Sequence, residues 1–153
     1  MKLLARELEP KEGIVLNPEA SVFWFDPQIQ AYDELTVQSC WHQLSERFPN
    51  WNEALLQDLT KEMNMLEHSN KQLNMLSTGS RRKVGILAGL ASGATATLLD
   101  QPFTALDMRS IQVIKEFLND MSEHPSRAWI AADYSAPTGI ALASVLNLNR
   151  SDS

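Results

Sequence analysis

Two segments in the second half of the chain constrain its fold more than any other feature. Residues 76–84 read Leu-Ser-Thr-Gly-Ser-Arg-Arg-Lys-Val, and residues 98–107 read Leu-Leu-Asp-Gln-Pro-Phe-Thr-Ala-Leu-Asp. A serine-glycine turn in the first segment opens a helical pattern that extends over 81–91. The second segment begins inside 95–99, a short, nearly uncharged run that is typical of a parallel strand buried on both faces. A helix that leads into such a strand favours an α/β fold with crossover helices.

The remaining hydrophobic pattern predicts further elements on both sides of this region. The expected helix caps are Thr36, Asn50 with Glu53, and Asp107, and Gly93 is expected to end the helix over 81–91. Residues 149–153 are expected to be disordered. We expect the last turns of a helix over 2–8, strands over 14–16 and 21–25, helices over 36–48 and 51–66, a helix over 107–121, and strands over 128–132 and 140–148.

Length and charge limit the classes of function. The chain has 153 residues, enough for one domain, and its formal net charge is −6. That charge argues against binding to nucleic acid or to an anionic membrane surface, since both need a positive field. The only basic run is 81–83, which we interpret as a solvated helix face. The three histidines are scattered without metal-ligand spacing and are expected at the surface.

The cysteine and the hydropathy pattern bear on the compartment. Cys40 is the single cysteine, so a disulfide within the chain is impossible, and its place on the apolar side of a helix predicts burial. No run approaches the ~20 apolar residues of a membrane span, and the first residues do not form a signal peptide. We expect a cytoplasmic protein with no direct membrane insertion. Any contact with the inner face of a membrane would be made through a partner.

Residues 76–107 resemble, without a gap, the ATP-binding subunit of ABC (ATP-binding cassette) transporters. The family carries a Leu-Ser-Gly-Gly-Gln signature. Ser77 and Gly79 match it, and Thr78 and Ser80 differ from it. The resemblance implies that these four residues bind the γ-phosphate of an ATP held by the opposing subunit. A helix N-terminus with free amides and a positive dipole end suits that role. An ordinary serine cap is the alternative interpretation of the loop.

The segment that follows resembles the Walker B strand and the D-loop. The resemblance places Asp100 near Mg²⁺ and Asp107 in a loop that lies across the dimer interface. Gln101 stands where the family has a glutamate that polarises the attacking water, and an amide cannot accept its proton. General-base action is worth roughly 10²–10⁴ in rate, so hydrolysis is expected to be slow or absent. Asp133 stands where the family has a histidine, and a carboxylate there would repel the γ-phosphate.

The first half of the chain supplies the rest of the resemblance. Gln28 resembles the glutamine of the Q-loop in an alignment that needs a one-residue shift, and Gln30 is the other glutamine that could match. A turn glutamine is the alternative interpretation. The implied division is a core remnant over 1–35, a helical subdomain over 36–75, and the signature, Walker B-like, D-loop and switch region over 76–153. The fold implied is a P-loop-NTPase-like parallel sheet with crossover helices and a helical subdomain.

The phosphate-binding Walker A loop is not found in this sequence. None of the six glycines begins a Gly-x-x-x-x-Gly-Lys-Ser/Thr pattern, and the resemblance places Met1 just after that loop. A start assigned too late and a true loss both remain open. In the family the strand that feeds the loop lies beside the strand that ends before Asp133. Its loss would leave unpaired backbone and exposed apolar surface, so a stable isolated monomer is not expected.

The resemblance implies a partial ABC-type ATP-binding subunit that couples ATP binding and hydrolysis to transport, with impaired hydrolysis. It implies ATP and Mg²⁺ as ligands, although we do not expect this chain to bind them alone. The implied partners are a transmembrane transporter subunit and a second ATP-binding subunit, in a homodimer or heterodimer. One alternative is a non-catalytic remnant or regulatory half-domain that acts only through association. An unrelated α/β domain with chance motif matches is the third.

Overall fold

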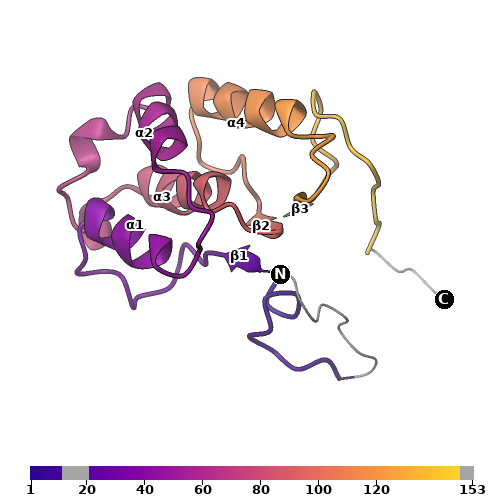
Figure 1. Ribbon diagram of the computed structural model, residues 1–153, viewed down its shortest axis with the longest axis horizontal. Coiled ribbons are helices and arrows are strands. Elements are labelled where there is room, and N and C mark those ends of the chain that lie inside the picture. The colour runs from indigo at the N-terminus through magenta and orange to yellow at the C-terminus, as the bar shows by residue number, and fades with distance from the viewer. Residues whose placement is uncertain (12–20, 149–153) are drawn as a thin grey trace.

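The computed structural model describes residues 1–11 and 21–148, which form a mixed α/β fold (Figure 1). The elements occur along the chain in the order β1, α1, α2, η1, η2, α3, β2, α4 and β3. Their bounds are β1 Val22–Trp24, α1 Val37–Ser45, α2 Glu53–Glu62, η1 Leu66–His68, η2 Leu73–Met75, α3 Thr78–Ala91, β2 Ala96–Asp100, α4 Met108–Asp120 and β3 Ala128–Ala132.

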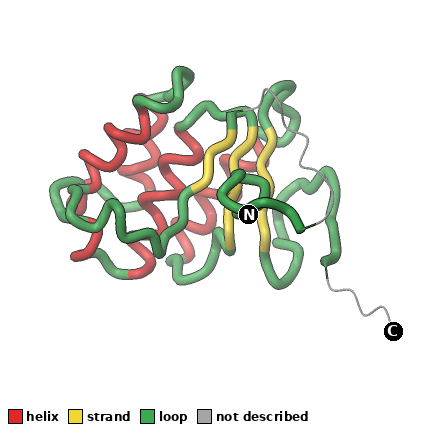
Figure 2. Tube along the Cα trace, turned by 90° about the horizontal axis from the view of Figure 1, so that it is seen from below, coloured by secondary structure: helices red, strands yellow, loops and turns green. Residues whose placement is uncertain are grey.

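The three strands form one parallel sheet in the order β1-β2-β3. Helices α3 and α4 cover one face of the sheet, and residues 1–11 lie on the opposite face (Figures 1 and 2). On the helical side Phe117 of α4 meets the Trp129 ring edge-on, with centroids 6.0 Å apart. The predicted α/β class with a parallel sheet and crossover helices is confirmed.

The central strand β2 and the outer strand β3 differ in burial. Leu98 and Leu99 are almost fully buried, as expected for a strand covered on both faces. Ile130 of β3 is 41% exposed, and β3 is an outer strand with no described strand beyond it. The prediction that 128–132 is a strand is therefore right, but the burial expected of it is wrong.

Local capping explains where most helices begin. The Thr36 hydroxyl accepts a hydrogen bond from the Ser39 amide at 3.1 Å, and the Asp107 carboxylate accepts one from the Ser110 amide at 2.9 Å. Both caps were expected from the sequence. Helix α2 is instead capped by Asn52, and not by Asn50 as the sequence pattern predicts.

Several expected helices are shorter or absent in the structure, and α1 ends at Ser45 rather than at 48. Helix α2 ends at Glu62 rather than at 66, because Asn64 adopts a left-handed backbone with φ of 55°. The expected helical segment over 2–8 is a series of turns, in which Arg6 has φ of 61°. The expected strand over 14–16 and the expected disorder of 149–153 lie outside the described residues.

The expected last strand over 140–148 is not formed. The chain after β3 turns toward α4, where Asn119 donates to the Gly139 carbonyl and accepts from the Ala141 amide. The apolar residues beyond this contact therefore remain exposed: Leu142, Val145, Leu146 and Leu148. Among the described residues, no helix is long and apolar enough to cross a membrane.

Candidate functional site

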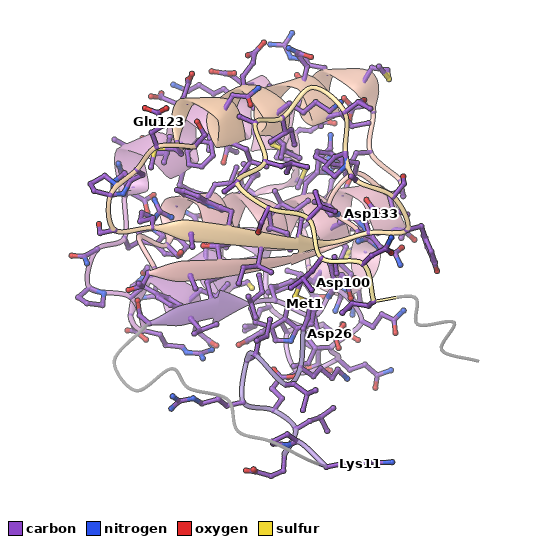
Figure 3. The ribbon with its side chains drawn as sticks, turned by 90° about the vertical axis from the view of Figure 1, so that its right-hand side faces the viewer. Met1, Lys11, Asp26, Asp100, Glu123 and Asp133 are labelled. Carbon is purple, nitrogen blue, oxygen red and sulfur yellow. The ribbon has the colours of Figure 1, made fainter. Side chains whose placement is uncertain are left out.

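The carboxyl ends of the three strands bring the acidic site residues to one edge of the sheet. Asp26 follows β1, Asp100 ends β2 and Asp133 follows β3, and Figure 3 shows all three at the same end of the strands. Asp100 pairs in register with Ala132, so Asp133 is the next residue on the neighbouring strand. In open α/β sheets this edge is the usual place for ligands.

The turn after β2 holds Gln101 in an unusual conformation. Its φ is 46°, a left-handed value that costs a residue other than glycine about 1–3 kcal/mol and is often found at functional sites. The backbone is fixed on several sides: the Gln101 amide donates to the Ala132 carbonyl at 2.8 Å, and the Thr104 amide donates back to the Gln101 carbonyl at 3.1 Å. The structure thus places a strained glutamine directly after Asp100.

The signature-like loop forms the N-terminus of α3. Ser77 is the cap: its hydroxyl accepts from the Ser80 amide at 3.1 Å and donates to the Ser80 hydroxyl at 3.0 Å. Ser77 and Thr78 are exposed, and the amides of Thr78 and Gly79 have no acceptor inside the helix because they belong to its first turn. The same residues thus form an ordinary serine cap and leave two first-turn amides without an acceptor inside the helix.

A close contact joins the signature-like loop to the D-loop-like segment. A Cβ added to Gly79 would collide with the carbonyl oxygen of Ala105, which itself has φ of 61°. Glycine is needed at 79 because the two backbones approach so closely. This contact shows that the two motifs found by sequence lie side by side in the fold.

The basic run 81–83 is not a solvated helix face, which corrects the interpretation from the sequence. Each of its side chains contacts a different loop. Arg81 donates to the Pro27 carbonyl, Arg82 to the Asp100 carbonyl, and Lys83 to the Met63 carbonyl. Lys83 is almost fully buried at 8% exposure. The partners are 54, 18 and 20 residues away in sequence, so no local pattern could reveal them.

Lys83 also pairs with the D-loop-like aspartate. Its Nζ lies 2.6 Å from Asp107 Oδ2, and it holds the pKa of Asp107 well below the usual range. Hydrogen bonds from the Ser110 amide and hydroxyl to the same carboxylate act in the same direction. In this structure Asp107 therefore serves as a helix cap and an ion-pair partner.

The other predicted residues, Gln28 and Asp133, take no part in the Lys83–Asp107 ion pair. Gln28 is exposed, and its amide donates to Asp26 Oδ1 at 2.9 Å in a tight turn. Asp133 is also exposed, and its carboxylate accepts from the Tyr134 amide at 2.7 Å. Cys40 is buried, as expected, and burial raises the pKa of its thiol to about 11, which disfavours the reactive thiolate at neutral pH.

The donor chemistry at the sheet edge fits a magnesium ion that is shared with a nucleotide. Asp100 is exposed, and its carboxylate makes no hydrogen bond or ion pair among the described residues. The described residues contain no group of three or more His, Cys, Asp or Glu side chains that could hold a metal alone. Mg²⁺ is usually bound by one or two carboxylates together with substrate phosphates, and a single free carboxylate suits that arrangement.

Sequence comparison finds relatives among ABC ATP-binding proteins, although no protein-family model matches the chain. The chain is 26% identical over 136 residues to the ABC transporter ATP-binding protein NatA of Bacillus subtilis, covering 79% of this chain and 55% of NatA. It is 24% identical over 160 residues to the carnitine transport ATP-binding protein OpuCA of Listeria monocytogenes, covering 94% of this chain and 40% of OpuCA. The chain thus spans about half or less of the length of these relatives.

Solved structures give the same fold. The archaeal ribosome recycling factor aABCE1 matches with a TM-score of 0.68 and 25% identity, over 85% of this chain and 25% of that one. An ABC transporter ATP-binding protein from Pyrococcus furiosus matches with a TM-score of 0.66 and 19% identity, over 90% of this chain and 72% of that one. The relatives in sequence and the neighbours in structure agree: the chain is similar in sequence to ABC ATP-binding proteins and shares the fold of ABC ATPase domains.

Proposed function

We propose that this chain supplies the signature side of an ATP site whose phosphates are held by a second ATP-binding subunit. The observation that carries the proposal is the N-terminus of α3, where Ser77 and Thr78 are exposed and Gly79 packs against the Ala105 carbonyl of the D-loop-like segment. The amides of its first turn and the positive end of the helix dipole would attract a γ-phosphate. The Ser77 hydroxyl, now bonded to Ser80, would turn to the phosphate.

The residues at the sheet edge support a role for Mg²⁺ without efficient hydrolysis. Asp100 would hold the ion, which when bound neutralises charge on the phosphates. Gln101 can orient a water through its amide but cannot take the proton, because a carboxamide has no basic site. Asp133 would add a negative charge beside the phosphates. Gln101 and Asp133 therefore support slow hydrolysis at this chain's own sheet edge.

The relatives NatA and OpuCA support a role in transport. In that role residues 36–75, which contain α1 and α2, form a helical subdomain that docks on a transmembrane subunit. Residues 1–35 and 76–153 then belong to the core. The buried indole of Trp41 donates to the Val84 carbonyl at 3.0 Å and ties α1 to the helix of the signature-like loop. Movement of the docked helices would therefore reach the ATP site.

The exposed outer edge of β3 favours a second candidate function. Ile130 is 41% exposed, and the edge has no partner strand among the described residues. A chain that completes its sheet only with an intact ATPase or a separately encoded piece would be a regulatory half-domain. In that case it would associate with its partner without changing ATP binding.

Equilibrium binding of MgATP tests the proposal. The probe is the chain mixed with an intact ABC ATPase subunit that carries a Gly-x-x-x-x-Gly-Lys-Ser/Thr loop, compared with each protein alone. We expect the chain alone to bind no ATP and the mixture to bind it more tightly than the intact subunit alone. Tight binding by the chain alone, or no gain in the mixture, contradicts the signature-side role. Association without any gain supports the regulatory half-domain.

A substitution at Gln101 tests the account of hydrolysis. Gln101→Glu restores a group that can accept a proton, but residues 1–153 contain no Walker A sequence to hold the phosphates. We therefore expect the Gln101→Glu chain alone to show no ATPase activity above that of the unmodified chain. Measurable turnover by this single variant, assayed as phosphate release, would show that the phosphates are held within the chain.

A further inference from the structure

Two adjacent arginines of α3 each hold the backbone on both sides of a glutamine. Arg81 donates from Nε to the Pro27 carbonyl at 2.7 Å and from Nη2 to the Ile29 carbonyl at 2.5 Å. These two carbonyls precede and follow Gln28. Nη2 of Arg81 also lies 2.7 Å from Asp33 Oδ1, and its side chain is only 14% exposed. The guanidinium is thus fixed in place before it reaches the loop.

Arg82 holds the second glutamine in the same way. Its Nη1 donates to the Asp100 carbonyl at 2.9 Å and to the Gln101 carbonyl at 3.1 Å, which are the carbonyls of the two peptides that flank the Gln101 Cα. Gln101 has a left-handed φ of 46°, so its backbone needs support from outside. The Arg82 Nε atom is buried and has no hydrogen-bond partner among the described residues, which shows how closely the chain packs around this side chain.

The two loops that the arginines hold face one another. A small cavity of about 20 Å³ is lined by Pro27 from the first loop, by Asp100 and Pro102 from the second, and by Arg82 between them. Both arginines lie within the first two turns of α3, directly after Ser80 of the signature-like loop. A rigid helix end therefore connects the exposed loop at 77–80 with both glutamine-bearing loops.

We propose that Arg81 and Arg82 are positioning residues, and that they set the orientation of Gln28 and Gln101, respectively, from the helix of the signature-like loop. The planar guanidinium suits this task because it offers several donors in a fixed geometry, and a single ammonium does not. A ligand that shifts the start of α3 would move both glutamines together. This inference rests on the proposed function for its consequence, but not for its geometry.

Nuclear magnetic resonance of the full chain, without nucleotide, tests whether each arginine affects only its own glutamine. We expect Arg81→Gln to displace the amide signals of Gln28 and its neighbours while Gln101 stays in place. Arg82→Gln should displace the signals of Gln101 and raise the hydrogen-exchange rate of its amide about tenfold, since bonds from a charged donor are lost. Arg109→Gln is the matched control, because Arg109 also donates to a backbone carbonyl, that of Glu62 at 2.7 Å.

The outcomes separate positioning from general stability. The proposal is overturned if each variant displaces the amide signals of both Gln28 and Gln101. It is also overturned if Arg81→Gln leaves Gln28, and Arg82→Gln leaves Gln101, unchanged. Either result means that the arginines only stabilise the helix. If Arg81→Gln and Arg82→Gln do not fold, Arg81→Lys and Arg82→Lys retain the charge and should give the same pattern, in which each variant displaces only one glutamine. No nucleotide is present in the measurement, so failure of the ATP proposal would leave this result unaffected.

Discussion

At the scale of single residues, the Lys83–Asp107 pair predicts a specific dependence of stability on pH. The pKa of Asp107 is lowered in the folded state, so its charged form stabilises the fold above the unfolded pKa of about 3.9 and this contribution is lost as the pH falls through the folded value. Asparagine caps helices as well as aspartate does, so Asp107→Asn removes the charge and keeps the cap. We expect Asp107→Asn to be less stable than the unmodified chain at pH 6.

The difference in unfolding free energy should shrink as the pH falls below about 4, where Asp107 of the unfolded chain takes up a proton while Asp107 of the folded chain stays charged. Urea unfolding at several pH values measures it. Asp58→Asn is the matched control, because Asp58 is an exposed aspartate in the middle of α2. An Asp107→Asn difference that is the same at pH 6 and at pH 2.5 would show that the ion pair does not stabilise the fold.

The contact between Gly79 and Ala105 predicts a large effect from a small substitution. Gly79→Ala places a methyl group against the Ala105 carbonyl, and such overpacking costs about 1–3 kcal/mol. Thr78→Ala, one residue earlier on the exposed first turn, should change the free energy of unfolding far less. Urea denaturation of both variants makes the comparison. Equal stability of the two would mean that the two backbones do not meet as closely as described.

At the scale of elements, α2 begins at one of two nearby asparagines, Asn50 and Asn52, that the sequence alone does not distinguish. The Asn52 side chain accepts from the Leu55 amide at 3.0 Å, while the pattern of Asn50 with Glu53 suggested a start two residues earlier. We expect Asn52→Ala to lower the free energy of unfolding by about 1 kcal/mol. Asn50→Ala should have a smaller effect in the same thermal or urea unfolding assay. The reverse order of the two effects would move the start of α2 to Asn50.

Elements that depend on local chemistry could be predicted from the sequence. Thr36, Ser77 and Asp107 cap helices because a side-chain oxygen bonds an amide three residues on, which is a short-range pattern. The prediction of a strand over 140–148 is wrong, because a segment rich in apolar residues does not say whether a neighbouring strand exists to pair with it. The exposed Leu146 and Leu148 show that apolar residues alone did not form a strand.

At the scale of the whole molecule, the sequence predicted the local positions of several candidate site residues but missed the contacts that join them. Motif spacing predicted Asp100 at a strand end and Asp107 at a helix start, and the structure has both there. It did not show that Arg81 and Arg82 reach from α3 to loops that are distant in the sequence. Such contacts depend on how α3 packs against the sheet, and no single segment encodes that packing.

The most direct test of the signature-side role is Ser77→Asp in the mixture with an intact ABC ATPase subunit. Aspartate is as good a helix cap as serine, so the variant should unfold at the same temperature as the unmodified chain. Its carboxylate would stand where the γ-phosphate should bind, and ATP affinity of the mixture should fall to that of the intact subunit alone. Thr36→Asp, the same kind of change at the cap of α1, is the control and should leave ATP affinity unchanged. Unchanged ATP affinity with a folded Ser77→Asp chain would contradict the account.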